Sequence, residues 1–142
     1  MGYLKEYYKQ LGAIPESDWH FIASCFGRRV FHKGEDIVKL NERGKNLYFI
    51  ETGMSRYYIP KEDDELTFNF SFEKEFAGAY DSFLSQTPSQ YSVQALVKTV
   101  SWQISYSSLQ DIYDHTKVGN YLGRLFTERL LVMKAQRELS AC

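Results

Sequence analysis

The chain has 142 residues, with 17 lysines and arginines against 18 aspartates and glutamates, and 44% of its residues are hydrophobic. This length suits one domain with one core, and the composition favours a globular chain over a disordered one. A formal net charge of −1 argues against a nucleic-acid binder that is held by its overall field. No apolar run approaches the roughly 18 residues of a membrane span, and the charged, tyrosine-rich start does not resemble a secretory signal.

Cysteines and histidines are few. Only Cys25 and Cys142 are present, which is too few for a disulfide framework, so we expect a cytoplasmic protein in a reducing compartment. The three histidines, His20, His32 and His115, lie far apart in the sequence. A zinc site needs at least three protein ligands, so we expect no metal.

Residues 3–27 carry the periodicity of helices. Tyrosines and leucines recur at three- and four-residue spacing before Gly12, which predicts a first helix. Pro15, followed by acidic residues, is typical of the first turn of a second helix, which we expect to end at Gly27.

Residues 28–106 change to a period of two, which predicts β-strands. Leu66, Phe68, Phe70 and Phe72 alternate with polar residues, and segments 91–97 and 100–104 repeat the pattern. Short strands separated by turn residues favour an antiparallel sandwich or closed barrel. Because basic residues are not interleaved with the three phenylalanines, we expect this stripe, like most aromatics, to fill the barrel interior rather than to stack on bases.

Residues 107–142 are again helical in pattern. Segment 117–142 carries five basic side chains against two acidic ones, whereas residues 1–116 carry 12 against 16. Apolar residues lie on more than one face of the long helix predicted over 122–139, so we expect one face to pack on the domain and another on a second copy. The alternative is a helix packed wholly on its own domain. The residues expected at the homodimer interface are Leu122, Leu125, Phe126, Arg129, Val132 and Met133.

No catalytic constellation is visible in the sequence. A nucleophile elbow, a Walker loop and a dinucleotide fingerprint are all absent. A cupin-like metal enzyme is the enzymatic competitor for this strand pattern, but the chain has no His-x-His pair. We therefore expect a binding protein rather than an enzyme.

One segment, residues 76–93, interrupts the strands with a predicted short helix after Gly78. Backbone N–H groups at the start of a helix can bind an anion. This segment is therefore the candidate ligand site.

Together these features resemble the sensor domain of the Crp–Fnr transcription regulators, which has the cyclic-nucleotide-binding fold. The resemblance covers nearly the whole chain. It rests on the Lys33-Gly34-Glu35 turn, the strand that leads to Gly53, the segment after Gly78 and the long final helix. The sequence of residues 80–96 is particularly similar to the Crp-type regulators of Bacteroidetes.

The resemblance implies a mainly-β fold in a single domain, residues 1–142. An antiparallel β jelly-roll over 28–106 would lie between N-terminal helices over 3–27 and C-terminal helices over 107–142, the last of them a long dimerisation helix. The iron–sulfur branch of the superfamily is excluded by the cysteine count, and isolated histidines give a haem branch little support.

Family members hold a cyclic nucleotide with a Gly-Glu-Leu cassette followed by Pro-Arg-Ser/Thr-Ala. Gly78 and Pro88 match this pattern, whereas Ala79 replaces the glutamate and Ser89 replaces the arginine. Loss of that arginine removes about 2–5 kcal/mol of phosphate binding, so we expect that cyclic AMP does not bind at physiological levels. Another small molecule, a protein partner or no ligand remains open. The residues expected to border the degenerate cassette are Gly78, Ala79, Ser82, Ser89, Gln90 and Tyr91.

The regulators of this family follow the long helix with a winged helix-turn-helix that reads DNA. In this sequence that domain would begin near residues 140–142, so we expect DNA contacts only through a domain outside it. The chain is therefore expected to be the effector-sensing and dimerisation domain of a Crp–Fnr-type regulator. The alternative is a stand-alone ligand- or protein-binding module of the same fold.

Overall fold

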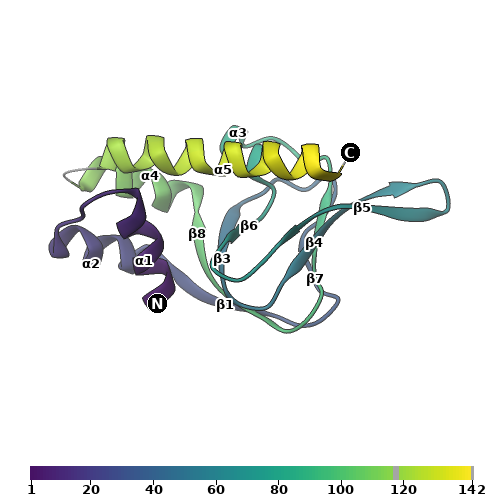
Figure 1. Cartoon of the computed structure of the whole chain (residues 1–142), viewed down its shortest axis with the longest axis horizontal. Coiled ribbons are helices and arrows are strands. Elements are labelled where there is room, and N and C mark those ends of the chain that lie inside the picture. The colour runs from purple at the N-terminus through teal and green to yellow at the C-terminus, as the bar shows by residue number, and fades with distance from the viewer. Residues whose placement is uncertain (117–118, 142) are drawn as a thin grey trace.

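Most helices gather at one end of a β-domain of two four-stranded sheets, and the final long helix runs along the domain (Figure 1). The computed structural model describes residues 1–116 and 119–141, without the side chains of 120, 122 and 134–141. The elements are α1 (Gly2–Leu11), α2 (Glu16–Ser24), β1 (Gly27–Phe31), β2 (Asp36–Val38), β3 (Asn46–Thr52), β4 (Ser55–Lys61), β5 (Asp64–Ser71), β6 (Phe76–Ala77), α3 (Tyr80–Ser85), β7 (Ser92–Ala95), β8 (Thr99–Ser105), α4 (Tyr106–His115) and α5 (Gly119–Ala141).

The strand orders are β1-β8-β3-β6 and β2-β7-β4-β5, and the paired strands are antiparallel. Strands distant in sequence pair in both sheets, as when β1 pairs with β8. The predicted mainly-β fold, with antiparallel sheets and flanking helices, is confirmed.

The two N-terminal helices form near the predicted positions. Helix α1 ends at Leu11, directly before Gly12, and Pro15 precedes the first turn of α2. The predicted end of α2 was wrong by three residues, because the helix ends at Ser24 and Gly27 already pairs with Gln103 as the first residue of β1.

Two clusters of buried side chains make up the core. Strand β3 serves both, because Leu47 and Phe49 face the helices while Tyr48 faces the second sheet. Four consecutive buried residues in β3 reflect this coverage of both faces. Many large aromatics therefore lie between the helices and a sheet rather than in the predicted barrel interior. The aromatics of the helix-covered cluster are Tyr7, Tyr8, Trp19, Phe26, Phe49, Phe76, Tyr80, Phe83 and Phe126.

The prediction that the β5 stripe is buried was wrong for most of its members. Leu66, Phe70 and Phe72 are 41%, 39% and 46% exposed, and only Phe68 packs against the inner cluster. A bulge is the cause for Phe70 and Phe72, which follow it, whereas Leu66 precedes it and pairs with Ile59. Tyr57 pairs with Asn69 but Tyr58 pairs with Thr67, so Phe68 is an extra residue in the ladder. Beyond it the face of the strand is reversed, since a one-residue shift exchanges the two faces.

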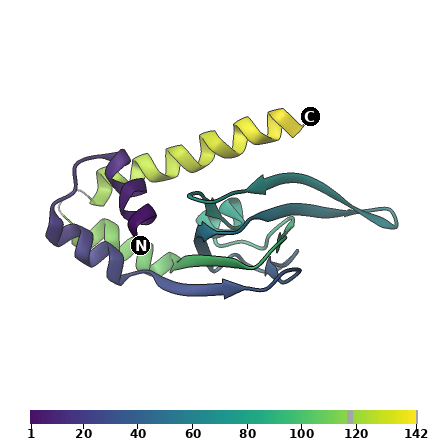
Figure 2. The same ribbon diagram turned by 60° about the horizontal axis from the view of Figure 1, so that its bottom comes forward.

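Helix α5 is 23 residues long. It begins beside α4 and α1 and extends along the β-domain toward β5 (Figure 2). None of the described helices has the length and apolar character needed to cross a membrane.

Candidate ligand site

The candidate site begins at a glycine whose backbone few other residues can adopt. Gly78 follows β6 with φ +141°, a region that favours glycine. Its N–H donates to the Tyr57 hydroxyl at 3.2 Å, inside the β-domain. A Cβ at this position would lie 3.1 Å from the Leu47 side chain. The cassette glycine is therefore held by the protein's own side chains.

Helix α3 follows at once, with buried Ala79 as its N-cap and no side chain capping it. Ser82, in the first turn of α3, makes its hydrogen bonds within the protein. Its Oγ accepts from the Gly44 N–H at 2.7 Å and donates to the Thr87 carbonyl. Ser82 therefore ties the loop before β3 to the end of α3 instead of facing a ligand.

The same β2–β3 loop pairs with the second half of the cassette. The Asn41 N–H donates to the Ser89 carbonyl and the Ser89 N–H donates to the Glu42 carbonyl, both at 2.8 Å. Arg43 forms a β-bridge with Pro88. These backbone bonds close one side of the segment where family members carry their arginine.

The three remaining predicted residues lie in different environments. Ser89 is 2% exposed, and its hydroxyl donates to the Tyr91 carbonyl at 2.7 Å. Gln90 is exposed. Tyr91 is buried, with its ring 5.7 Å from that of Tyr57 and 5.5 Å from that of Phe68. Ser89 and Tyr91 are therefore built into the core, and only Gln90 of these three faces outward.

Tyrosine hydroxyls fill the interior behind Gly78. The Tyr57 hydroxyl shares a 2.6 Å hydrogen bond with Ser71 and lies 3.5 Å from the Tyr80 hydroxyl, which donates to the Phe76 carbonyl. Burial raises the pKa of Tyr80 well above its ordinary value, so the hydroxyl stays neutral at physiological pH. The sequence did not single out Tyr57, because its contact with Gly78 joins residues 21 positions apart.

The cassette lacks the charged groups with which family members hold a cyclic nucleotide. Neither a carboxylate nor a guanidinium stands at Ala79 or Ser89, and the Tyr91 ring packs in the interior. A cavity beside Ser82 and Ser89 has a volume of about 140 Å³, below the roughly 300–1,000 Å³ of small-molecule sites. A second cavity, of about 410 Å³, is lined by residues of the β2–β3 loop together with Tyr48.

The residues predicted for the dimer interface separate into groups. Phe126 is 1% exposed, and the centre of its ring lies 4.8 Å from that of Phe76. It therefore belongs to the domain's own core, and its assignment to an interface was wrong. Val132 is 56% exposed, whereas Leu125 and Met133 are half-buried. The Leu122 side chain lies outside the described residues.

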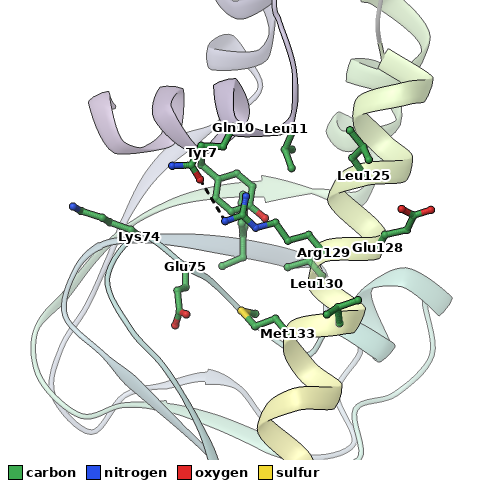
Figure 3. Close-up of a pocket in the computed structure, with 12 residues that line it drawn as sticks. Tyr7, Gln10, Leu11, Lys74, Glu75, Leu125, Glu128, Arg129, Leu130 and Met133 are labelled. Carbon is green, nitrogen blue, oxygen red and sulfur yellow. Dashed lines mark hydrogen bonds between the residues drawn. The ribbon is translucent and has the colours of Figure 1, made fainter.

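Arg129, the sixth of these residues, lies over the Tyr7 ring at 4.7 Å and donates to Gln10 at 3.4 Å. It borders a groove of about 720 Å³ between α1 and α5 (Figure 3). Within the described residues, no group of three His, Cys, Asp or Glu side chains is placed to hold a metal ion.

The comparisons with known proteins agree with this architecture. The chain is 30% identical over 88 residues to the cAMP-dependent protein kinase regulatory subunit of Debaryomyces hansenii, covering 62% of this chain and 19% of that protein. The catabolite activator protein of Thermus thermophilus has a similar structure, with a TM-score of 0.67, 19% identity, and coverage of 89% of this chain and 60% of that one.

The c-di-GMP-responsive global regulator of Xanthomonas campestris is also similar, with a TM-score of 0.71, 16% identity, and coverage of 89% of this chain and 62% of that one. The chain thus spans only about a fifth of the kinase subunit and less than two thirds of either regulator. Residues 28–116, more than half of the chain, match the family described as the cyclic nucleotide-binding domain, and the chain belongs to that family.

Proposed function

We propose that this chain is the effector-sensing and dimerisation domain of a Crp–Fnr-type transcription regulator, and that it acts in the cytoplasm by binding rather than by catalysis. The fold shared with the Thermus and Xanthomonas regulators supports the proposal. The resemblance to Bacteroidetes regulators stays a prediction from the sequence. DNA contacts would be made by a separate helix-turn-helix domain, and no residue of this chain is assigned to them.

The observation that carries the dimerisation role is the outward apolar face of α5. Phe126 and Leu130, one turn apart, are each 1% exposed and attach the helix to its own domain. On the other side, Tyr121, Leu131 and Val132 are 52%, 47% and 56% exposed. Large apolar side chains gathered on one exposed helix face are typical of protein interfaces, and a second copy of the same helix is the simplest symmetric partner.

The degenerate cassette supports the proposal that the effector of this domain is not cyclic AMP. Ser82 and Ser89 make hydrogen bonds within the chain, and the Tyr91 ring packs on Phe68 in the interior. The Xanthomonas regulator, which has the same fold, responds to c-di-GMP, so this fold is not restricted to cyclic AMP.

Light scattering of a double variant tests the dimerisation role. Leu125→Glu with Val132→Glu places one carboxylate at the exposed Val132 and another at the half-buried Leu125, both on α5. We expect a monomer where the wild type is a dimer, because unpaired charge in an apolar interface is costly. Lys98→Glu, at an exposed loop residue, makes the same total change in charge and should remain dimeric. A double variant that stays dimeric would remove α5 from the interface.

The alternative is a stand-alone ligand- or protein-binding module of the same fold, without a role on DNA. It is favoured by the Debaryomyces relative, which is the regulatory subunit of a protein kinase. The discriminating observation is whether the reading frame continues past residue 142 into a helix-turn-helix.

A further inference from the structure

A groove outside the cassette has the size and composition of a small-molecule site. It lies between α1, the turn before β6, and α5 (Figure 3), and its volume of about 720 Å³ is within the range of ligand pockets. Its apolar wall is formed by Leu11, Phe76, Leu125, Leu130 and Met133. None of the residues predicted for the cassette lines it.

A single cation reaches across this groove. Figure 3 shows Arg129 pointing from α5 toward Tyr7 and Gln10, whereas Lys74 and Glu128 point away. Among the described residues, no carboxylate lies within ion-pair distance of Arg129, although the side chains of Arg29, Arg56 and Arg124 each have one. Arg129 is therefore a guanidinium positioned by an aromatic ring and an amide rather than by an acid.

The packing of Arg129 leaves donors for a ligand. The guanidinium carbon lies 4.7 Å from the centre of the Tyr7 ring, and its five N–H groups are arranged as a planar fork that matches a carboxylate. One of them donates to Gln10 Oε1 at 3.4 Å, and the amide of Gln10 carries N–H donors of its own. Burial raises the pKa of Tyr7 to about 12, so the neighbouring phenol is neutral and adds no negative charge.

We propose that this groove binds a small organic acid with an apolar body, the carboxylate held by Arg129 and Gln10 and the body lying on Phe76 and Leu130. The acid would contact α5 directly, which deepens the proposed function by giving the domain an effector site outside the degenerate cassette. Its regulatory meaning rests on the proposed sensing role, whereas the binding itself does not.

Calorimetry with octanoate as the probe tests the site. We expect octanoate to bind the wild-type chain with one site per protomer, and octanol, which has the same chain length without the charge, to bind at least about tenfold more weakly. Arg129→Gln should weaken octanoate binding about tenfold, since hydrogen bonds to charged groups are the strong ones. Arg129→Lys should fall between, because it keeps the charge and loses the fork.

The matched control is Arg124→Gln, which removes a cation from the same helix outside the groove and should bind octanoate like the wild type. Absence of binding to the wild type at about 10 mM octanoate, or equal binding by Arg129→Gln, would overturn the proposal. Binding that survives Arg129→Gln but is lost in Phe72→Ser would place octanoate on the exposed phenylalanines at the end of β5 instead and also overturn it.

Light scattering on the same samples separates this proposal from the dimerisation role. If wild-type protein forms dimers but octanoate affinity falls as protein concentration rises into the dimeric range, the second copy occupies the groove and the ligand proposal fails while dimerisation stands. If octanoate binds as expected to a chain that is monomeric, the ligand site stands and the dimerisation role fails.

Discussion

Tyr91 places a large buried ring at a position of the binding motif that is small in the family. Family members carry a small alanine at this place, whereas here a phenol ring packs between Tyr57 and Phe68. The aromatic contacts stabilise the closing strand and at the same time occupy the interior. A position that is small in the family pattern is part of the core packing in this chain.

Calorimetry with cyclic AMP tests whether the cassette binds this nucleotide and what Tyr91 contributes. We expect no saturable binding by the wild type at about 1 mM nucleotide, because both charged partners are absent at Ala79 and Ser89. Tyr91→Ala should also fail to bind, and it should lower the free energy of unfolding by about 3 kcal/mol through loss of buried area and the cavity left behind. Micromolar affinity in the wild type would contradict the charge argument, and binding gained in Tyr91→Ala would show that the ring alone blocks the site.

At the scale of elements, a single bulge decides which side of β5 faces the core. Every second side chain lies on one face of the sheet before Phe68 and on the opposite face after it. The consequence is an outward pair, Phe70 and Phe72, whose rings stack at 6.2 Å, and an inward pair of small polar residues, Asn69 and Ser71.

Helix α4 connects the β-domain to α5, and its start depends on a side-chain cap. The Ser105 Oγ accepts from the Ser108 N–H at 3.1 Å. Ser105→Ala should lower the free energy of unfolding by about 1 kcal/mol in urea denaturation, because a helix N–H loses its acceptor. Ser105→Thr keeps the oxygen and should retain most of the stability. Equal losses in the two variants would show that the cap is not the cause.

At the scale of the whole molecule, helices and sheet share one aromatic cluster. The Phe126 ring of α5 packs on Tyr8 of α1 and on Phe76 of β6, so segments from both ends of the chain depend on one another. A signal at the groove between α1 and α5 would therefore reach the helix proposed to dimerise without passing through the cassette.

Alkaline denaturation tests how much this shared cluster depends on neutral tyrosines. Burial raises the pKa of Tyr7 to about 12, above the value near 10 of an unfolded chain. The sign follows from proton binding: the contribution is complete below about pH 10 and is lost as the pH rises toward about 12. For Tyr7 the loss is at most about 2–3 kcal/mol.

Urea denaturation between pH 9 and pH 11.5 measures this loss. Tyr7→Phe removes the titrating group and should lose less stability over this range than the wild type. Tyr3→Phe, at a residue that is 42% exposed, should follow the wild type. A Tyr7→Phe curve parallel to that of the wild type would show that the loss comes from other groups.

Periodicity by itself determined the kind of elements and their approximate order. Helices before and after a β-domain follow from the periodicity. The end of α1 before Gly12 and the start of α2 after Pro15 follow from local backbone preferences, which neighbouring residues decide. The absence of a glutamate at Ala79 and an arginine at Ser89 was likewise evident without coordinates.

Only the tertiary structure decided which faces are covered and which side chains meet. The bulge at Phe68 reversed a face that alternation alone assigned to the core, and Phe126 moved from a predicted interface into the domain's own interior. The Tyr57 contact with Gly78 and the Arg129 contact with Tyr7 join residues far apart in sequence. Pairing register and long-range packing set these contacts, and neither leaves a local signal in the chain.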